Sequence, residues 1–212
     1  MQIDILSLFP DYFRGPFDES IIKRARAKGI LDIRLIDIRD FADNPHRRVD
    51  DRPYGGGPGM VLKVGPVVRA IREVKTSASK VIYLSPQGKT LNAESCREIA
   101  QYEHLVLLCG HYEGVDERAL MLEVDEELSI GDYVLTNGCA AAIVVVDAVA
   151  RFIPGVIGNE KSVSEDSFEQ GVLRSRPFTR PPVYEGMEVP EVLKSGNHQK
   201  IQEFRKSRSK KI

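Results

Sequence analysis

The chain lacks the features of a secreted, disulfide-stabilised or membrane-spanning protein. Its three cysteines, Cys96, Cys109 and Cys139, are widely spaced and form neither a CxxC motif nor a zinc-binding spacing. No apolar run approaches the roughly 18 residues that a membrane span needs. The N-terminus, MQIDILSLFP, has no basic segment and no small-residue cleavage site of a secretion signal. We therefore expect a cytoplasmic protein with reduced thiols, no membrane partner and no metal-ligand cluster.

The chain also has little net charge, −1 at pH 7, so its total charge does not indicate a nucleic-acid partner. The charges are unevenly distributed, however. Residues 113–132 contain eight acidic residues and one Arg, whereas residues 198–212 contain six Lys or Arg and one Glu. A basic tail can contact an RNA backbone, but solvated C-termini have the same composition, and charge alone leaves both interpretations open.

A length of 212 residues suits one large domain, or one domain with a small appendage. Apolar patterns predict strands over 2–9, 31–35, 80–84 and 105–109, and helices over 18–28, 66–74, 92–101 and 138–152. Such alternation indicates an α/β domain with a largely parallel sheet. The polar stretch 158–171 is typical of a linker, and helices at 189–194 and 197–208 follow it. This last segment is too small to form a core alone.

Glycine-containing turns follow the apolar runs at three places. Gly110 ends the run 105–109, Gly131 interrupts a second apolar stretch, and the turn 85–88 follows the strand 80–84. Glycine lets the backbone approach a ligand closely. Because ligands of open α/β sheets bind at the carboxyl ends of strands, we predict that these three junctions form one cleft.

The stretch 40–59 predicts a long loop that combines Arg47, Arg52, several Asp residues, Tyr54 and four glycines. Loops of this length in compact domains are usually functional or disordered. The mixture of Arg, Asp and an aromatic residue favours a loop that closes on a ligand. The alternative is a flexible surface loop.

Seven longer motifs carry a resemblance to a known family. They are DILSLFP (4–10), VDDRPYGGGPGM (49–60), YLSPQG (83–88), CGHYEGVDER (109–118), SIGDYVLT (129–136), RFIPGVIGNEKSVSEDSF (151–168) and EGMEVPEVLKSGNH (185–198). In this order they resemble the bacterial tRNA (guanine-N1)-methyltransferases, the TrmD family. The resemblance implies methylation of N1 of guanosine 37 of tRNA, next to the anticodon, with S-adenosylmethionine as methyl donor.

The resemblance also implies the architecture. The fold is expected to be a SPOUT methyltransferase domain, an α/β fold with a deep trefoil knot, followed by a small helical C-terminal domain. We assign 1–157 to the cofactor-binding domain, 158–172 to a flexible linker and 173–212 to a domain that binds tRNA. The family's enzymes are homodimers whose active sites are shared between subunits, and they are helped by Mg²⁺.

Site residues are carried over position by position. The cofactor would be bound by Tyr83, Leu84, Ser85, Pro86, Gln87, Gly88, Gly110, Tyr112, Glu113, Ile130, Gly131, Asp132, Tyr133, Val134, Leu135, Asn137 and Gly138. The candidates for RNA contacts are Arg47, Asp50, Arg52, Tyr54, Arg180, Lys200 and Arg205.

The family's catalytic Arg and Asp match Arg151 and Asp166. Methylating N1 of guanine requires removal of its proton while O6 gains negative charge. A carboxylate with an ordinary pKa of about 3.9 is ionised at pH 7 and can take that proton, and an Arg aimed at O6 would stabilise the developing charge. From composition alone, Asp166 would be a solvated loop acid and Arg151 a cation at a helix C-terminus.

Two stretches differ from the family's usual sequence. Asn137-Gly138-Cys139-Ala140-Ala141-Ala142 replaces Gly-Gly-Glu-Leu-Pro-Ala, and Arg174-Ser175-Arg176-Pro177 replaces Asp-Cys-Pro-His. We interpret both as lineage differences, because Arg151 and Asp166 remain. Two other functions stay open at this point. A nucleotide-binding oxidoreductase would fit the α/β alternation, although GxGxxG is missing after the first strand, and a non-catalytic RNA-binding protein would fit a degenerate cofactor pocket.

Overall fold

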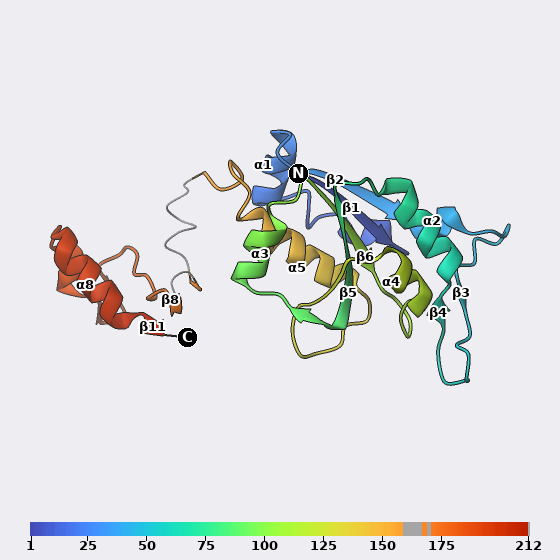
Figure 1. The fold of residues 1–212 in the computed structure, drawn as a ribbon. Coiled ribbons are helices and arrows are strands. Elements are labelled where there is room, and N and C mark those ends of the chain that lie inside the picture. Colours follow the sequence, from blue (N-terminus) through green and yellow to red (C-terminus); the bar gives the residue numbers. More distant parts are fainter. Residues whose placement is uncertain (159–166, 169–170, 212) are drawn as a thin grey trace. The chain divides into compact units, whose positions relative to one another are not determined.

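The computed structural model describes residues 1–158, 167–168 and 171–211, and the chain divides into two compact units, Met1–Gly158 and Asn159–Ile212 (Figure 1). The first unit contains a five-stranded sheet. Its strands are β1 (Gln2–Ser7), β2 (Asp32–Asp37), β5 (Ser79–Thr90), β6 (His104–Cys109) and β7 (Glu126–Ser129). They lie in the order β2-β1-β6-β5-β7, and each neighbouring pair is parallel. The predicted α/β class with a parallel sheet is confirmed.

Helices cover both faces of this sheet. On one side lie α1 (Ser20–Ala27), α3 (Ala93–Ile99) and α5 (Cys139–Ala150), and on the other lie α2 (Val64–Val74) and α4 (Glu117–Glu123) (Figure 1). Along β6, Leu105 and Leu107 belong to the first apolar cluster, whereas Val106 and Leu108 belong to the second. Burial on both faces explains why this strand is apolar from Leu105 to Cys109 instead of alternating.

Local signals explain where two of the helices form. Asn92 caps α3 as predicted: its side chain accepts a hydrogen bond from the Ser95 backbone N–H at 2.9 Å, and the Ser95 hydroxyl accepts one from the Asn92 N–H at 2.9 Å. The β-branched run inside α5 does not convert it to a strand. Its Val145 and Val146 are at most 1% exposed, and this packing outweighs a small propensity penalty.

The structure corrects two expectations from the sequence. The strand at 80–84 does not end in a turn, because β5 continues to Thr90, and Leu84 and Lys89 both lie opposite Leu128 of β7. The residues between them form a bulge. Gly88 makes this possible, since a Cβ there would lie 2.3 Å from the Leu128 backbone nitrogen. The short helix α4 was also missed, because its acidic surroundings resemble a turn.

Shorter elements complete the first unit. They are the 3-10 helices η1 (Pro10–Phe13) and η2 (Ile38–Phe41) and the antiparallel strands β3 (Asp50–Asp51) and β4 (Val61–Leu62). Most of the predicted loop 40–59 has no regular structure. Within the described parts of the chain, no helix is long and apolar enough to cross a membrane.

A closed polar network lies near the amino ends of the strands. Asp4 of β1 is 0% exposed, and its carboxylate accepts hydrogen bonds from Arg34 at 2.6 and 2.5 Å. Nε2 of His104 lies 2.9 Å from the same carboxylate, and its Nδ1 lies 2.7 Å from the Ser79 hydroxyl. Burial would raise the pKa of Asp4, but the hydrogen bonds from Arg34 and His104 outweigh it and the pKa is lowered.

The second unit is small and open. Its elements are β8 (Val172–Leu173) paired with β11 (Lys210–Lys211), β9 (Val183–Tyr184) paired with β10 (Met187–Glu188), α7 (Glu191–Lys194) and α8 (His198–Arg208). The Asn197 side chain caps α8 by accepting a hydrogen bond from the Lys200 N–H at 3.1 Å. None of its described residues is buried, which is expected for a segment too small to form its own core.

Candidate cofactor pocket

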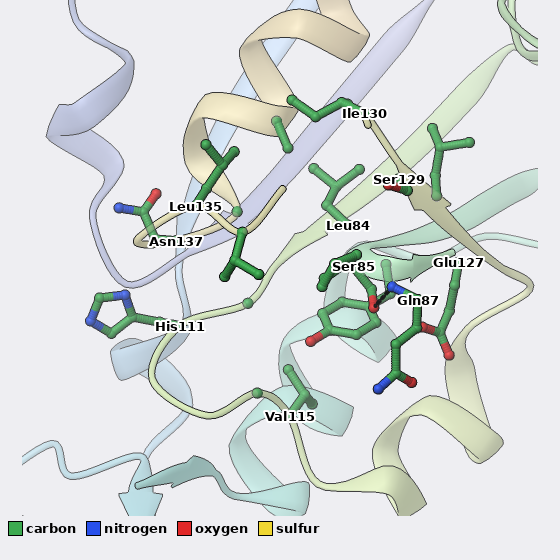
Figure 2. A pocket seen from close by; sticks show the side chains of 18 of the residues that line it. Leu84, Ser85, Gln87, His111, Val115, Glu127, Ser129, Ile130, Leu135 and Asn137 are labelled. Atoms are coloured by element: carbon green, nitrogen blue, oxygen red, sulfur yellow. Dashed lines mark hydrogen bonds between the residues drawn. The ribbon is translucent and has the colours of Figure 1, made fainter. Parts of the chain in front are cut away.

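A cavity of about 550 Å³ lies at the carboxyl ends of β5, β6 and β7 in the first unit. Small-molecule sites usually have volumes of about 300–1,000 Å³. Its walls come from residues 83–87, 110–117 and 127–138, and Figure 2 shows labelled side chains from all three segments around one space. The structure therefore brings together the three glycine-containing junctions that the sequence singled out.

Most of the residues carried over from the family line this cavity. They are Tyr83, Leu84, Ser85, Pro86, Gln87, Gly110, Tyr112, Glu113, Ile130, Gly131, Tyr133, Val134, Leu135, Asn137 and Gly138. Gly88 and Asp132 do not. Gly88 packs against the backbone of β7, and Asp132 is exposed in the loop after that strand.

The floor of the pocket is made by two glycines from separate segments. The Gly138 N–H donates a hydrogen bond to the Gly110 carbonyl at 2.8 Å. A Cβ on Gly138 would lie 2.9 Å from the Cys109 Cα, and a Cβ on Gly110 would lie 2.9 Å from the Tyr83 hydroxyl oxygen. A side chain at either glycine would thus displace a neighbour and reduce the space available to a ligand.

The lining is acidic. Glu113, Glu117 and Glu127 contribute carboxylates, and none of the described residues that line the cavity is a Lys or Arg. Burial, with a smaller contribution from the charge of Glu127, raises the pKa of Tyr83 to about 12, so its phenol remains protonated at neutral pH. These groups favour a ligand that carries positive charge and accepts a hydrogen bond.

Several lining residues lie outside the predicted stretches: Gly114, Val115, Glu117, Leu120, Glu127, Leu128, Ser129 and Ala141. His111 and Thr136 lie inside the predicted stretches 110–113 and 130–138 without having been named individually. His111 is the most distinctive. Its Nδ1 is buried without a hydrogen-bond partner among the described residues. Its ring lies edge-on to Phe9 at 5.0 Å and to Tyr112 at 4.3 Å. Burial, and then the charge of Arg39, lowers its pKa, so the ring is neutral at pH 7. Its position between the predicted Gly110 and Tyr112 was the available signal.

The changed sequence at 137–142 still starts a helix. The Asn137 side chain accepts a hydrogen bond from the Cys139 N–H at 2.8 Å, which satisfies one free donor at the beginning of α5. Asn137 therefore has a structural role in this chain beside its place in the pocket wall.

The loop 40–59, called the glycine-rich loop below, ends beside the rim of the pocket, and the residues directly after it are hydrogen-bonded to that rim. The Glu113 N–H donates to the Met60 carbonyl at 2.9 Å, and the Leu62 N–H donates to the Gly114 carbonyl at 2.9 Å. Gly59 has a φ of +76°, and a Cβ there would lie 2.5 Å from a carboxylate oxygen of Glu113. The loop and the pocket therefore share backbone contacts at this point.

The RNA-contact candidates of the first unit lie on this loop, outside the cavity. Arg47 pairs with Asp40 and lies 3.3 Å from Asp37, while the Tyr54 side chain is 99% exposed. Two further candidates lie beside them. Asp50 starts β3, and the Arg52 N–H donates to the Asp51 carboxylate at 2.9 Å.

The candidates of the second unit lie around its own cavity or on α8. Arg180 and Arg205 line a cavity of about 850 Å³ that is also lined by Arg174, Arg176, Lys194, Phe178 and Phe204. Its lining includes no acidic residue among those that the structure describes. Lys200 is exposed on α8. Cations beside exposed aromatic rings suit a polyanion that carries bases.

The two predicted catalytic residues are placed differently. Arg151 is exposed and directly follows α5, and it does not line the cavity. Asp166 lies outside the described residues. The part of the chain that is described contains no group of three or more His, Cys, Asp or Glu side chains that could hold a metal ion.

Fold and pocket together define an α/β protein with an acidic cavity, suited to a small cationic ligand, at the carboxyl edge of a parallel sheet. The family model for tRNA (guanine-1)-methyltransferase TrmD matches residues 1–212. The chain belongs to this family.

Similar proteins carry the same name, tRNA (guanine-N(1)-)-methyltransferase. The protein from Protochlamydia amoebophila is 66% identical over 97% of this chain and 92% of its own length. Another, from Carboxydothermus hydrogenoformans, is 54% identical over 99% of this chain and 83% of its own. The protein from Chlamydia trachomatis serovar D is 61% identical over 97% of this chain, which spans only 58% of that longer relative.

Proposed function

We propose that this chain methylates N1 of guanosine 37 in tRNA, next to the anticodon, with S-adenosylmethionine as methyl donor. The observation that carries the proposal is the match of the whole chain to one methyltransferase family, together with a pocket built by that family's cofactor segments. The oxidoreductase alternative has no such support.

The pocket fits the donor in size and charge. S-adenosylmethionine has a sulfonium and an ammonium group, and the described lining presents the carboxylates of Glu113, Glu117 and Glu127 without a Lys or Arg. The glycine floor exposes backbone groups that can hydrogen-bond the adenine and ribose. When bound, the donor supplies an electrophilic methyl group on a positively charged sulfur.

The chain's own groups act on the guanine. Asp166 takes the N1 proton, and Arg151 stabilises the negative charge that develops on O6. No covalent intermediate is needed, because methyl transfer requires only an in-line approach of N1 to the methyl group.

The architecture we propose is the SPOUT fold with a trefoil knot. Its support is the close approach of Gly138 to the backbone of Cys109 and Gly110, after which the chain continues into α5 on the face of β6. We assign 1–157 to the cofactor domain, 158–172 to the linker and 173–212 to the tRNA-binding domain. The active form is a homodimer with shared active sites, and a two-fold dimer is the most common closed symmetry. No described residue of the chain's second unit is buried, so the partner subunit would supply the apolar contacts that this unit lacks.

The tRNA is held by cations of both units. Arg47 and Arg52 on the glycine-rich loop, and Arg180, Lys200 and Arg205 of the second unit, contact phosphates. Their attraction offsets the few kcal/mol needed to unstack the target guanine.

The deciding experiment is methyl transfer from labelled S-adenosylmethionine to two tRNA transcripts that differ only at position 37. Incorporation into the transcript with guanosine, and none into its adenosine counterpart, is expected. No incorporation into either, with no heat of cofactor binding in calorimetry, would replace this proposal with a non-catalytic RNA-binding function.

A further inference from the structure

Two cysteines lie directly beneath the floor of the cofactor pocket. Cys109 is the last residue of β6 and Cys139 is the first residue of α5, and each is 1% exposed. Their neighbours Gly110 and Gly138 line the cavity. The thiols are therefore one residue away from the ligand space, on the two segments that form its floor.

These segments touch at the level of the backbone. The hydrogen bond from Gly138 to Gly110 and the 2.9 Å approach of a Gly138 Cβ to the Cys109 Cα bring the two chains together beside the cysteines. Cys109 and Cys139 also belong to the same buried apolar cluster. A disulfide needs Cα atoms about 4.4–6.8 Å apart, and the contact between the adjoining backbone segments places the two cysteines side by side.

The environment makes the two thiols unequal. Hydrogen bonding with Cys109, together with the Ser7 hydroxyl oxygen 3.1 Å from the Cys139 sulfur, outweighs burial and lowers the pKa of Cys139 to about 7. The hydrogen bond to Cys139 and complete burial raise the pKa of Cys109 well above its usual value. A thiolate beside a protonated thiol is the arrangement used in reactive dithiols.

We propose that Cys109 and Cys139 are an oxidative modification site, where a peroxide forms a disulfide that closes the cofactor pocket. The Cys139 thiolate attacks the peroxide O–O bond and becomes a sulfenic acid, releasing one water after protonation. The Cys109 thiol then attacks the sulfenic sulfur, forms the S–S bond and releases a second water. Two thiols lose two electrons and two protons, and hydrogen peroxide is reduced to two waters.

The disulfide acts on the pocket through the backbone. Its sulfurs must move to a separation of about 2.05 Å, which draws the start of α5 toward the end of β6. Cys139 then also loses its hydrogen bond with Ser7. Because Gly110 and Gly138 adjoin the two cysteines, the floor shifts with them. The consequence for S-adenosylmethionine rests on the proposed function, whereas the thiol chemistry does not.

The first test measures the disulfide alone in the full-length chain. After treatment with hydrogen peroxide, we expect a mass loss of about 2 Da, the two hydrogens of a disulfide, and one remaining thiol of the three. Peptide mapping should join Cys109 to Cys139, and dithiothreitol should reverse the change. Cys96→Ser is the matched control, because Cys96 is also buried but lies on α3, and it should still form the bridge.

Cys139→Ser should abolish the bridge while keeping a side chain of similar size. If the unmodified chain keeps three free thiols after peroxide treatment, or forms a bridge that involves Cys96, the proposal is overturned.

The second test measures cofactor affinity by calorimetry before and after oxidation. At least about tenfold weaker binding, or 1.4 kcal/mol, is expected in the oxidised chain, with recovery after reduction. Cys139→Ser should show no such sensitivity to peroxide. A bridged chain that binds the donor as tightly as the reduced chain would refute closure of the pocket. A reduced chain that binds no donor would instead refute the proposed function, while the mass measurement still decides the thiol chemistry.

Discussion

The two ends of the central sheet have opposite chemistry. At the amino end, the buried Asp4 carboxylate accepts hydrogen bonds from the half-exposed Arg34 and lies 2.9 Å from the buried His104 ring. At the carboxyl end, glycines replace side chains, and the buried Nδ1 of His111 has no partner among the described residues.

The difference separates stability from function within one set of strands. A buried charge needs all its partners at once, so the amino end is a closed network that contributes only when complete. A ligand site needs space and unpaired groups, and these cost stability. Substitutions at one end should therefore change unfolding, and substitutions at the other should change binding and rate.

The largest effect is expected at the closed end. Asp4→Asn leaves Arg34 facing a neutral group and should destabilise the chain by about 3 kcal/mol, the lower end of the range for breaking a buried pair, since Arg34 remains half exposed. Chemical denaturation measures this change. The control is Asp11→Asn in the exposed pair with Arg14, which should cost at most about 1 kcal/mol. If Asp4→Asn also lowered cofactor affinity in the folded chain, the separation of stability from binding between the two ends would be wrong.

The reaction should depend on Asp166. Asp166→Asn keeps the size of the side chain but removes the base, so single-turnover methylation should slow by at least about 10²-fold. Arg151→Ala should act similarly through O6, and the double variant should lose less than the sum, because both residues serve one proton transfer. Cofactor affinity should remain unchanged in each variant. A rate for Asp166→Asn within about threefold of the unmodified chain, below the general-base range, would assign the proton to another group.

The open end should respond to added volume. Gly110→Val places methyl groups against the Tyr83 hydroxyl and should weaken S-adenosylmethionine binding at least about tenfold. Gly158→Val is the matched control, since a Cβ there meets nothing within 4 Å. Calorimetry measures both affinities, and circular dichroism checks that the fold is intact. Equal affinity in the two variants would remove Gly110 from the binding site.

Acid should reveal the closed end without any substitution. The folded-state pKa of Asp4 lies below its unfolded value of about 3.9. Its stabilising contribution is therefore present above that value and is lost as the pH falls through the folded pKa. The melting temperature should drop more steeply for the unmodified chain than for Asp4→Asn below about pH 4. Parallel curves for the two chains would show that Asp4 is not the titrating group.

The smallest effect is expected from metal removal. The described residues contain no cluster of metal ligands, yet the family resemblance implies help from Mg²⁺. If Mg²⁺ acts through the bound substrates, EDTA should slow methylation while leaving the melting temperature of the free chain unchanged. A lowered melting temperature would instead indicate a metal site within the protein.

Features of the fold that depend on neighbouring residues could be predicted from the sequence, whereas those that depend on contacts between distant segments could not. The apolar run 105–109 of β6 and the Asn92 cap of α3 each depend on residues close together in the sequence, so both were predictable. The bulge between Leu84 and Lys89 depends on Gly88 fitting against a strand forty residues later, which no local pattern contains.

The candidate site divides in the same way. Glycines after apolar runs indicated the pocket, because strand ends meet at one edge of a parallel sheet. The resemblance supplied Asp166, whose surroundings look like a solvated loop. Neither source indicated that His111 would lack a partner, since that depends on how Phe9 and Tyr112 pack around it.

The contact between Gly110 and Gly138 at the pocket floor also determines when, during synthesis of the chain, the pocket can be completed. Gly110 and its strand leave the ribosome early, but the hydrogen bond that completes the floor comes from Gly138, at the start of α5. A nascent chain that stops before this helix can contain every strand of the sheet and still lack a place for its ligand. Binding competence therefore arrives with one late segment, and the free ligand cannot assist the folding of what precedes it.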